Sequence, residues 1–149
     1  MSYRELFFDL DGTLSDSAEG ILNSVIYALE RLGLEPPARE SLFRYIGPPL
    51  IRSFSEEPGV LPEQVGRAVE LYRENYTVRG IYECSAYDGV REALHALRAE
   101  GYRLTLATCK PWTLAERVLE HLGFRDCFDF VSAQIILSKI LWLIFVMKA

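Results

Sequence analysis

The sequence predicts an α/β domain with a parallel sheet, interrupted after its first strand by a mainly helical insertion. Two short apolar runs, Arg4–Leu10 and Tyr102–Thr108, end in polar loops and are each followed by an amphipathic helix. This alternation is typical of parallel βα units. Between them, over residues 15–82, apolar residues recur at helical spacing, and we find no convincing strand there. A hydrophobic content of 50% with 25% charged residues suits a globular chain.

The elements follow in order from this pattern. After the first strand, Ser15, Asp16 and Ser17 are N-cap candidates for a helix that ends at Gly33. Prolines and glycines then divide the insertion into short helices and turns, and Pro62 opens one of its helices.

The α/β pattern resumes near Tyr87. Asp88 is the expected cap of a helix that ends at Gly101, and the strand Tyr102–Thr108 follows it. Pro111 opens the next helix, and Phe128–Val131 is a possible third strand.

Net charge and cysteine content indicate which ligands and which cellular compartment to expect. A net charge of −5 argues against nucleic-acid binding, which is typical of proteins with a basic surface. The three cysteines are an odd number without paired spacing, and no secretory signal precedes the first motif, so we expect a reduced cytoplasmic setting.

Residues 135–149 differ in composition from the rest of the chain. They contain two lysines, Lys139 and Lys148, but no arginine and no acidic residue. Their longest uninterrupted apolar run covers eight residues, 140–147, whereas a membrane-spanning helix needs about 20. A buried or interfacial segment is the preferred interpretation, with membrane association as the alternative.

Two carboxylates follow the first predicted strand. Asp9 and Asp11 lie at its carboxyl end, where open α/β sheets bind their ligands. Like charges so close together favour a hard cation such as Mg²⁺ between them. One carboxylate can then attack an electrophile while the other transfers protons. The alternative is that Asp11–Gly12 is only a turn and Asp9 a capping residue.

Three stretches extend this signal: FFDLDGTLSDSAEGI (7–21), YIGPPL (45–50) and TCKP (108–111). Together they resemble haloacid-dehalogenase-like hydrolases, in the branch of phosphoglycolate phosphatases and 5′-nucleotidases. The resemblance implies that Asp9 is the nucleophile that forms an aspartyl phosphate and also a Mg²⁺ ligand. It implies that Asp11 is the general acid and base and binds the metal through its backbone carbonyl. Thr108 and Lys110 would bind the substrate phosphate.

The resemblance also implies a Rossmann-like core, residues 1–14 and 83–134, with a helical cap at residues 15–82. Residues 135–149, set apart by their composition, form an atypical tail. Arg44 and Arg52 in the cap are candidates for contacting an anionic substrate. The expected partner is a small phosphorylated metabolite and not nucleic acid; a membrane is the less favoured alternative, and the oligomeric state is open.

Resemblance to the family stops after Val131. The lysine and the acidic pair expected downstream in a complete member are missing, and no Asp or Glu follows Asp129. The core is therefore expected to be incomplete, and the chain to be truncated after residue 131. Two functions remain open: a Mg²⁺-dependent phosphatase of small monoesters, and a catalytically inactive member that at most binds a ligand or partner.

Overall fold

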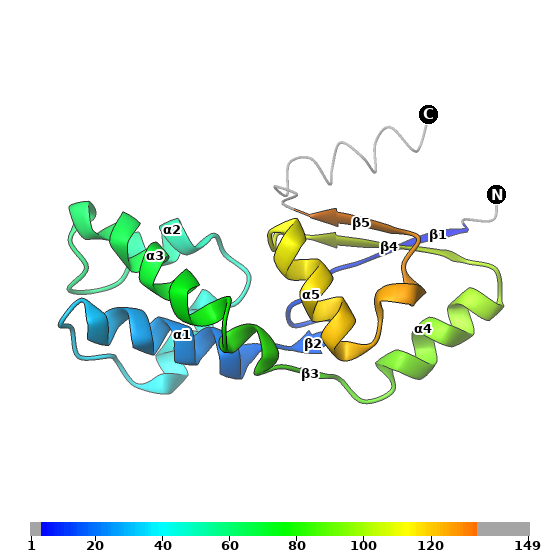
Figure 1. The fold of residues 1–149 in the computed structure, drawn as a ribbon, viewed down its shortest axis with the longest axis horizontal. Coiled ribbons are helices and arrows are strands. Elements are labelled where there is room, and N and C mark those ends of the chain that lie inside the picture. Colours follow the sequence, from blue (N-terminus) through cyan, green and yellow to red (C-terminus); the bar gives the residue numbers. More distant parts are fainter. Residues whose placement is uncertain (1–3, 134–149) are drawn as a thin grey trace. The chain divides into compact units, whose positions relative to one another are not determined.

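The structure, a computed structural model, describes residues 4–133. Its contacts divide the chain into two compact units, residues 1–14 with 87–149 and residues 15–86 (Figure 1). The tail predicted at residues 135–149 lies outside the described residues. No helix within the described range is long and apolar enough to cross a membrane.

The described part of the first unit contains a parallel sheet of three strands in the order β1-β4-β5: β1 (Glu5–Phe8), β4 (Arg103–Thr108) and β5 (Phe130–Ala133). Phe8 pairs with Leu106, and Leu106 pairs with Val131. The central strand is the most deeply buried, since Leu104 and Leu106 are inaccessible to solvent. The predicted α/β fold with a parallel sheet is confirmed.

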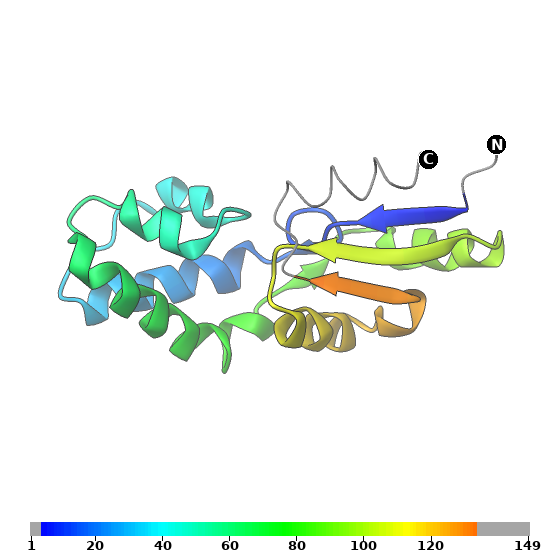
Figure 2. The same cartoon turned by 90° about the horizontal axis from the view of Figure 1, so that it is seen from above.

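Two helices, α4 (Val90–Ala99) and α5 (Trp112–Leu122), lie on the same side of this sheet (Figures 1 and 2). On the opposite face the register aligns Phe7, Thr105 and Phe130 across the three strands, and Thr105 in the centre is buried. Phe7 is 45% exposed and Phe130 56% exposed.

Arg91 of α4 links this helix to the C-terminal end of α5. Arg91 donates hydrogen bonds to the carbonyl oxygens of Leu122 at 2.5 Å and Gly123 at 3.2 Å. Its guanidinium also lies 5.4 Å from the ring centroid of Phe124. Gly123 takes a left-handed conformation with φ of 71°, as predicted for the residue that ends this helix.

The second unit consists mainly of helices, as predicted. Its regular elements are α1 (Ala18–Arg31), η1 (Arg39–Tyr45), α2 (Leu50–Ser55), η2 (Pro62–Gln64), α3 (Val65–Tyr76) and η3 (Gly80–Tyr82). Its core includes edge-to-face contacts between the rings of Tyr45 and Phe54 and of Phe54 and Tyr72, with centroids 5.0 and 6.4 Å apart. Such pairs stabilise beyond the apolar area that they bury.

Helix α1 approaches η3 so closely that two glycines meet. A Cβ atom on Gly20 would lie 1.8 Å from the carbonyl oxygen of Gly80, and a Cβ on Gly80 would lie 2.6 Å from the hydroxyl of Ser24. Only residues without a side chain fit at this crossing.

The prediction of no strand between residues 15 and 82 is wrong. Ser15–Asp16 forms β2 and pairs in antiparallel fashion with β3 (Ser85–Ala86), where the chain enters and leaves the second unit. Strands of two residues are too short to produce an alternating pattern in the sequence. At the N-terminus of α1, Asp16 Oδ1 accepts a hydrogen bond from the backbone N–H of Ala18 at 3.1 Å.

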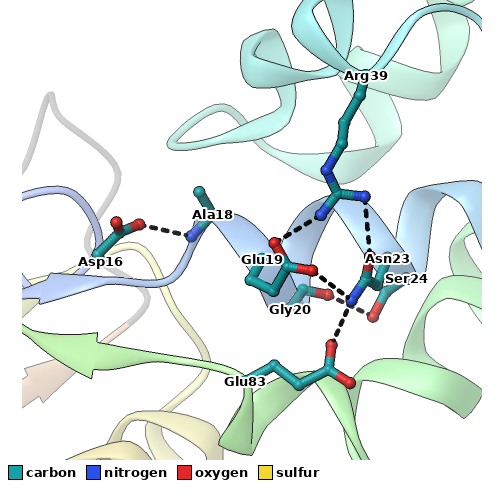
Figure 3. A network of polar contacts seen from close by, with 8 residues as sticks. All are labelled: Asp16, Ala18, Glu19, Gly20, Asn23, Ser24, Arg39 and Glu83. Carbon is teal, nitrogen blue, oxygen red and sulfur yellow. Dashed lines mark hydrogen bonds and ion pairs between the residues drawn. The ribbon is translucent and has the colours of Figure 1, made fainter.

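Side chains at this end of α1 form a connected polar network (Figure 3). Arg39 of η1 contacts Glu19 at 2.7 Å and donates a hydrogen bond to Asn23 Oδ1 at 2.9 Å. Asn23 Nδ2 donates in turn to Glu83 Oε2 at 2.8 Å. The network therefore joins η1, α1 and the segment leading into β3.

Candidate active site

The candidate site lies where β1 and β4 end. Asp9 directly follows β1, and Thr108 is the last residue of β4. Because the strands are parallel neighbours, their carboxyl ends lie at the same edge of the sheet. Asp11 lies two residues after Asp9, and Lys110 lies two residues after Thr108.

The loop after β1 is a tight turn anchored by its apolar residues. Leu10 and Leu14 are buried, and the carbonyl oxygen of Leu10 accepts hydrogen bonds from the N–H groups of Thr13 at 3.2 Å and Leu14 at 3.0 Å. Gly12 has a φ of 77°, a conformation that glycine adopts without strain. The turn leaves Asp9 exposed and Asp11 partly buried.

An ion pair joins the two loops. Lys110 Nζ lies 3.0 Å from Asp11 Oδ2, and the two side chains are only 6% and 17% exposed. Attraction between such charges is stronger than on an open surface, where solvent screens it. Thr108 supports the same loop, since its buried Oγ1 accepts a hydrogen bond from the N–H of Lys110 at 3.2 Å.

The two carboxylate oxygens of Asp11 differ sharply in their environment. Oδ2 contacts Lys110, whereas Oδ1 is buried and has no hydrogen-bond partner among the described residues. An unsatisfied buried acceptor costs about 1–3 kcal/mol. Oδ1 is thus a buried acceptor whose hydrogen-bonding capacity is unused among the described residues.

The site also contains Cys109, which is exposed. Partial burial of its sulfur raises the pKa of the thiol, and the nearby negative charge of Asp9 raises it further. The thiol is therefore protonated at neutral pH and is a poor nucleophile.

No group of three or more His, Cys, Asp or Glu side chains within residues 4–133 is arranged to hold a metal ion. Asp9 and Asp11 nonetheless offer hard oxygen donors, and Asp11 Oδ1 is unsatisfied. Mg²⁺ commonly binds through one or two carboxylates, with water and substrate phosphate completing its coordination. The donor set therefore fits Mg²⁺ better than a softer metal.

The two cap arginines singled out from the sequence already have partners within the second unit. Arg44 lies 2.6 Å from the buried carboxylate of Glu57, which also accepts a hydrogen bond from the Tyr45 hydroxyl at 2.7 Å. Arg52 pairs with Glu56 at 3.0 Å. Their role as substrate ligands stays a prediction.

Two contacts were missed from the sequence. The Asp11–Lys110 pair joins residues far apart in the chain, and only the pairing of β1 with β4 brings them together. The burial of Glu57 had no local signal, because it lies in a charged stretch that resembles a solvated turn.

A protein-family model described as "haloacid dehalogenase-like hydrolase" matches residues 6–139, a range that contains Asp9, Asp11, Thr108 and Lys110. The chain belongs to this family. The match ends at residue 139, eight residues beyond Val131, where the sequence analysis placed the end of the resemblance.

Three curated proteins illustrate what this chain is similar to. A 5′-nucleotidase of Pseudomonas aeruginosa is 42% identical over 88% of this chain and 59% of its own length. The tyrosine-protein kinase PtkA of Mycobacterium tuberculosis is 36% identical over 85% of this chain and 43% of its own. A phosphoglycolate phosphatase of Cereibacter sphaeroides is 33% identical over 83% of this chain and 59% of its own length.

Among solved structures, a predicted phosphatase from Clostridium acetobutylicum superposes with a TM-score of 0.83 at 37% identity, over 89% of this chain and 62% of that one. The chain thus spans less than two thirds of the length of these relatives. The haloacid dehalogenase-like fold is shared with them over the matched region.

Proposed function

We propose that the chain is a Mg²⁺-dependent phosphatase that hydrolyses a small phosphate monoester, phosphoglycolate- or nucleotide-like, through an aspartyl-phosphate intermediate. The observation that carries the proposal is the exposed Asp9 beside the partly buried Asp11, at the end of neighbouring parallel strands in a haloacid dehalogenase-like chain. The names of two relatives, a 5′-nucleotidase and a phosphoglycolate phosphatase, support the substrate class.

In this mechanism an oxygen of Asp9 attacks phosphorus and forms the aspartyl phosphate. The bond from phosphorus to the ester oxygen breaks, and Asp11, which enters this step as the protonated carboxylic acid, donates its proton to the departing alkoxide. Asp11 then takes a proton from a water molecule that attacks the phosphorus, so that orthophosphate leaves and Asp9 is restored. The exposure of Asp9 and the unsatisfied Oδ1 of Asp11 suit these two roles.

Residues of the β4 side contribute to binding. The hydroxyl of Thr108 accepts a bond from the N–H of Lys110 and has its own hydrogen available for a phosphate oxygen. Lys110 adds a positive charge to the site. A Mg²⁺ ion held by the carboxylate of Asp9 and the backbone carbonyl of Asp11 would supply Lewis-acid stabilisation of the phosphoryl charge.

We further propose a cytoplasmic protein whose partner is a small phosphorylated metabolite. The three cysteines, Cys84, Cys109 and Cys127, are free thiols, which is compatible with a reducing compartment. The net charge of −5 favours a small substrate over nucleic acid.

A second candidate is a catalytically inactive member that binds a ligand without turnover. It is favoured because the described residues contain no cluster of three metal-ligating side chains. Two carboxylates alone would hold Mg²⁺ weakly until a substrate phosphate completes its coordination.

Phosphate release by the purified chain distinguishes the two candidates. The assay uses p-nitrophenyl phosphate with Mg²⁺ or with EDTA, and the Asp9→Asn variant as control. The phosphatase proposal predicts release that requires Mg²⁺ and is lost in the variant. Folded wild-type protein that releases no more phosphate than the variant would favour the inactive candidate.

A further inference from the structure

Trp112, the first residue of α5, is an aromatic side chain left exposed on the core side of its helix. The buried residues of α5 are Ala115, Val118, Leu119 and Leu122. Trp112 precedes Leu119 by seven residues, about two turns, and therefore lies on nearly the same side of the helix. Leu119 is inaccessible to solvent, whereas Trp112 is 56% exposed. Helical position alone thus predicts a packed residue, and the structure leaves most of this side chain open.

The chain path places Trp112 beside the residues proposed to bind phosphate. Three residues separate it from Thr108, the last residue of β4, and Lys110 is one of them. Successive Cα atoms are about 3.8 Å apart, so the Cα atoms of Lys110 and Trp112 are separated by at most about 7.6 Å. Side chains on an α-helix lean towards its N-terminus, which for Trp112 is the side of the loop after β4. The indole ring is therefore within reach of a group attached to a phosphate bound at Thr108 and Lys110.

The chemistry of the indole ring limits what it can bind there. Its flat faces stack on other planar rings, and such stacking depends little on the hydrogen-bonding groups of the ligand. The alcohol part of phosphoglycolate is a short aliphatic acid and offers no planar ring. In a nucleoside 5′-monophosphate a nucleobase is joined to the phosphate through one ribose, which gives a span comparable with that between Lys110 and Trp112.

We propose that Trp112 stacks on a planar ring in the alcohol part of the substrate and thereby selects a nucleoside monophosphate over phosphoglycolate. This rests on the proposed function for the bound phosphate and chooses between the two kinds of substrate named there. Trp112 contributes to binding, and the bond-breaking steps stay with Asp9 and Asp11. Its loss should therefore raise KM and leave kcat nearly unchanged.

Kinetics with two esters test the selection. Wild type, Trp112→Ala and Trp112→Phe are compared with adenosine 5′-monophosphate (AMP) and with phosphoglycolate, each with Mg²⁺. Trp112→Ala should lower kcat/KM for AMP by about 5- to 150-fold, the range for one lost stacked base, and for phosphoglycolate by less than about twofold. Trp112→Phe should recover part of the loss, because a phenyl ring also stacks. Phe130→Ala is the matched control: Phe130 is equally exposed but begins β5, and its loss should change neither ester.

The fluorescence of Trp112 supplies a measurement that needs no turnover. The chain has two tryptophans, Trp112 and Trp142, so in the full-length Trp142→Phe variant the indole emission comes from Trp112 alone. The variant is titrated with AMP and with ribose 5-phosphate in the presence of Mg²⁺ and read within milliseconds of mixing, before turnover. A base stacked on the indole quenches its emission, so we expect saturable quenching by AMP and none by ribose 5-phosphate.

The outcomes separate this proposal from the proposed function. Saturable quenching by AMP in a chain that hydrolyses neither ester would refute the phosphatase activity and retain the stacking. Hydrolysis of both esters with equal losses in Trp112→Ala would retain the phosphatase and overturn the stacking. Quenching that does not saturate, or that ribose 5-phosphate matches, would overturn the stacking whether or not the chain is active.

Discussion

Replacing Gly20 by alanine probes how closely α1 and η3 approach each other. The new Cβ would lie 1.8 Å from the carbonyl oxygen of Gly80 and 2.7 Å from its carbonyl carbon. A separation of at least 3.0 Å is needed, so the two backbones would have to move apart by 3.0 − 1.8 = 1.2 Å. The clash is with backbone atoms, which cannot rotate away as the end of a side chain can.

The expected cost follows from two opposing effects. Overpacking of a well-packed site costs about 1–3 kcal/mol and occasionally more. The shift would also stretch the hydrogen bond from Gly20 N–H to the carbonyl oxygen of Glu83, now 3.1 Å, which is worth about 1 kcal/mol. Alanine in a helix gains about 0.5–1 kcal/mol over glycine. We therefore expect Gly20→Ala to lower the free energy of unfolding by about 2–3 kcal/mol.

Gly66 supplies the matched control. It also lies in a helix, α3, but a Cβ there would have nothing within 4 Å. Gly66→Ala should therefore raise the free energy of unfolding by about 0.5–1 kcal/mol. Urea unfolding of both variants, followed by circular dichroism at the helix band, measures the difference. A Gly20→Ala variant as stable as Gly66→Ala would refute the close approach.

Three further variants test other contacts. Burial and, second to it, the hydrogen bond to Glu57 raise the pKa of Tyr45, so the folded state keeps this proton at a pH near 10, where the unfolded chain loses it. The free energy of unfolding should therefore fall by up to about 1.4 kcal/mol per pH unit above pH 10. The Tyr45→Phe variant should lack this part of the fall when its unfolding is measured against pH. The hydrogen bond from the N–H of Leu104 and, second to it, the contact with Arg98 lower the pKa of Asp129. The ionised carboxylate therefore stabilises the fold above its ordinary pKa, and this stabilisation is lost as the pH falls below about 4. The stability of Asp129→Asn should depend less on pH in this acid range. Arg91→Met removes the hydrogen bonds to the C-terminal carbonyls of α5 and should cost about 1–2 kcal/mol in thermal or urea unfolding, whereas no change would mean that the α5 end is held otherwise.

The sequence predicts the three strands of the parallel sheet because each is an apolar run bounded by polar loops. The boundaries shift where a buried residue lies just outside a strand. Phe128 was assigned to the third strand, yet it precedes β5 and packs edge-on against the ring of Phe8 at 6.1 Å. A buried aromatic side chain in a turn is indistinguishable in sequence from one in a strand.

The starts of helices are predicted less well than their ends, where Gly33, Gly101 and Gly123 take the left-handed conformation. Asp88 was expected to cap α4, but Gly89 is the N-cap and has a φ of 78°. Ser17 is the N-cap of α1 without a side-chain hydrogen bond, and Asp16 contributes the contact instead. Several polar residues in a row offer equivalent caps, and only the backbone path selects among them.

For the candidate site, motif residues were recognised but not their contacts. Asp9 and Asp11 follow one strand and Thr108 and Lys110 follow another, so their presence at one edge follows from parallel pairing. The contact of Lys110 with Asp11 depends on the turn at Gly12 and on the anchoring of the Lys110 backbone by Thr108. Such tertiary details leave no periodic signal in either segment.

The most direct test of the central claim is detection of a phosphoryl group on Asp9. The wild-type chain is mixed with p-nitrophenyl phosphate and Mg²⁺, quenched in acid within the first turnover, digested and analysed by mass spectrometry. The account predicts one added phosphoryl group on the peptide that contains Asp9, and its absence in Asp9→Asn, with turnover reduced at least about 1,000-fold. Mg²⁺-dependent turnover that persists in Asp9→Asn, or a phosphoryl group found on another residue, would contradict it.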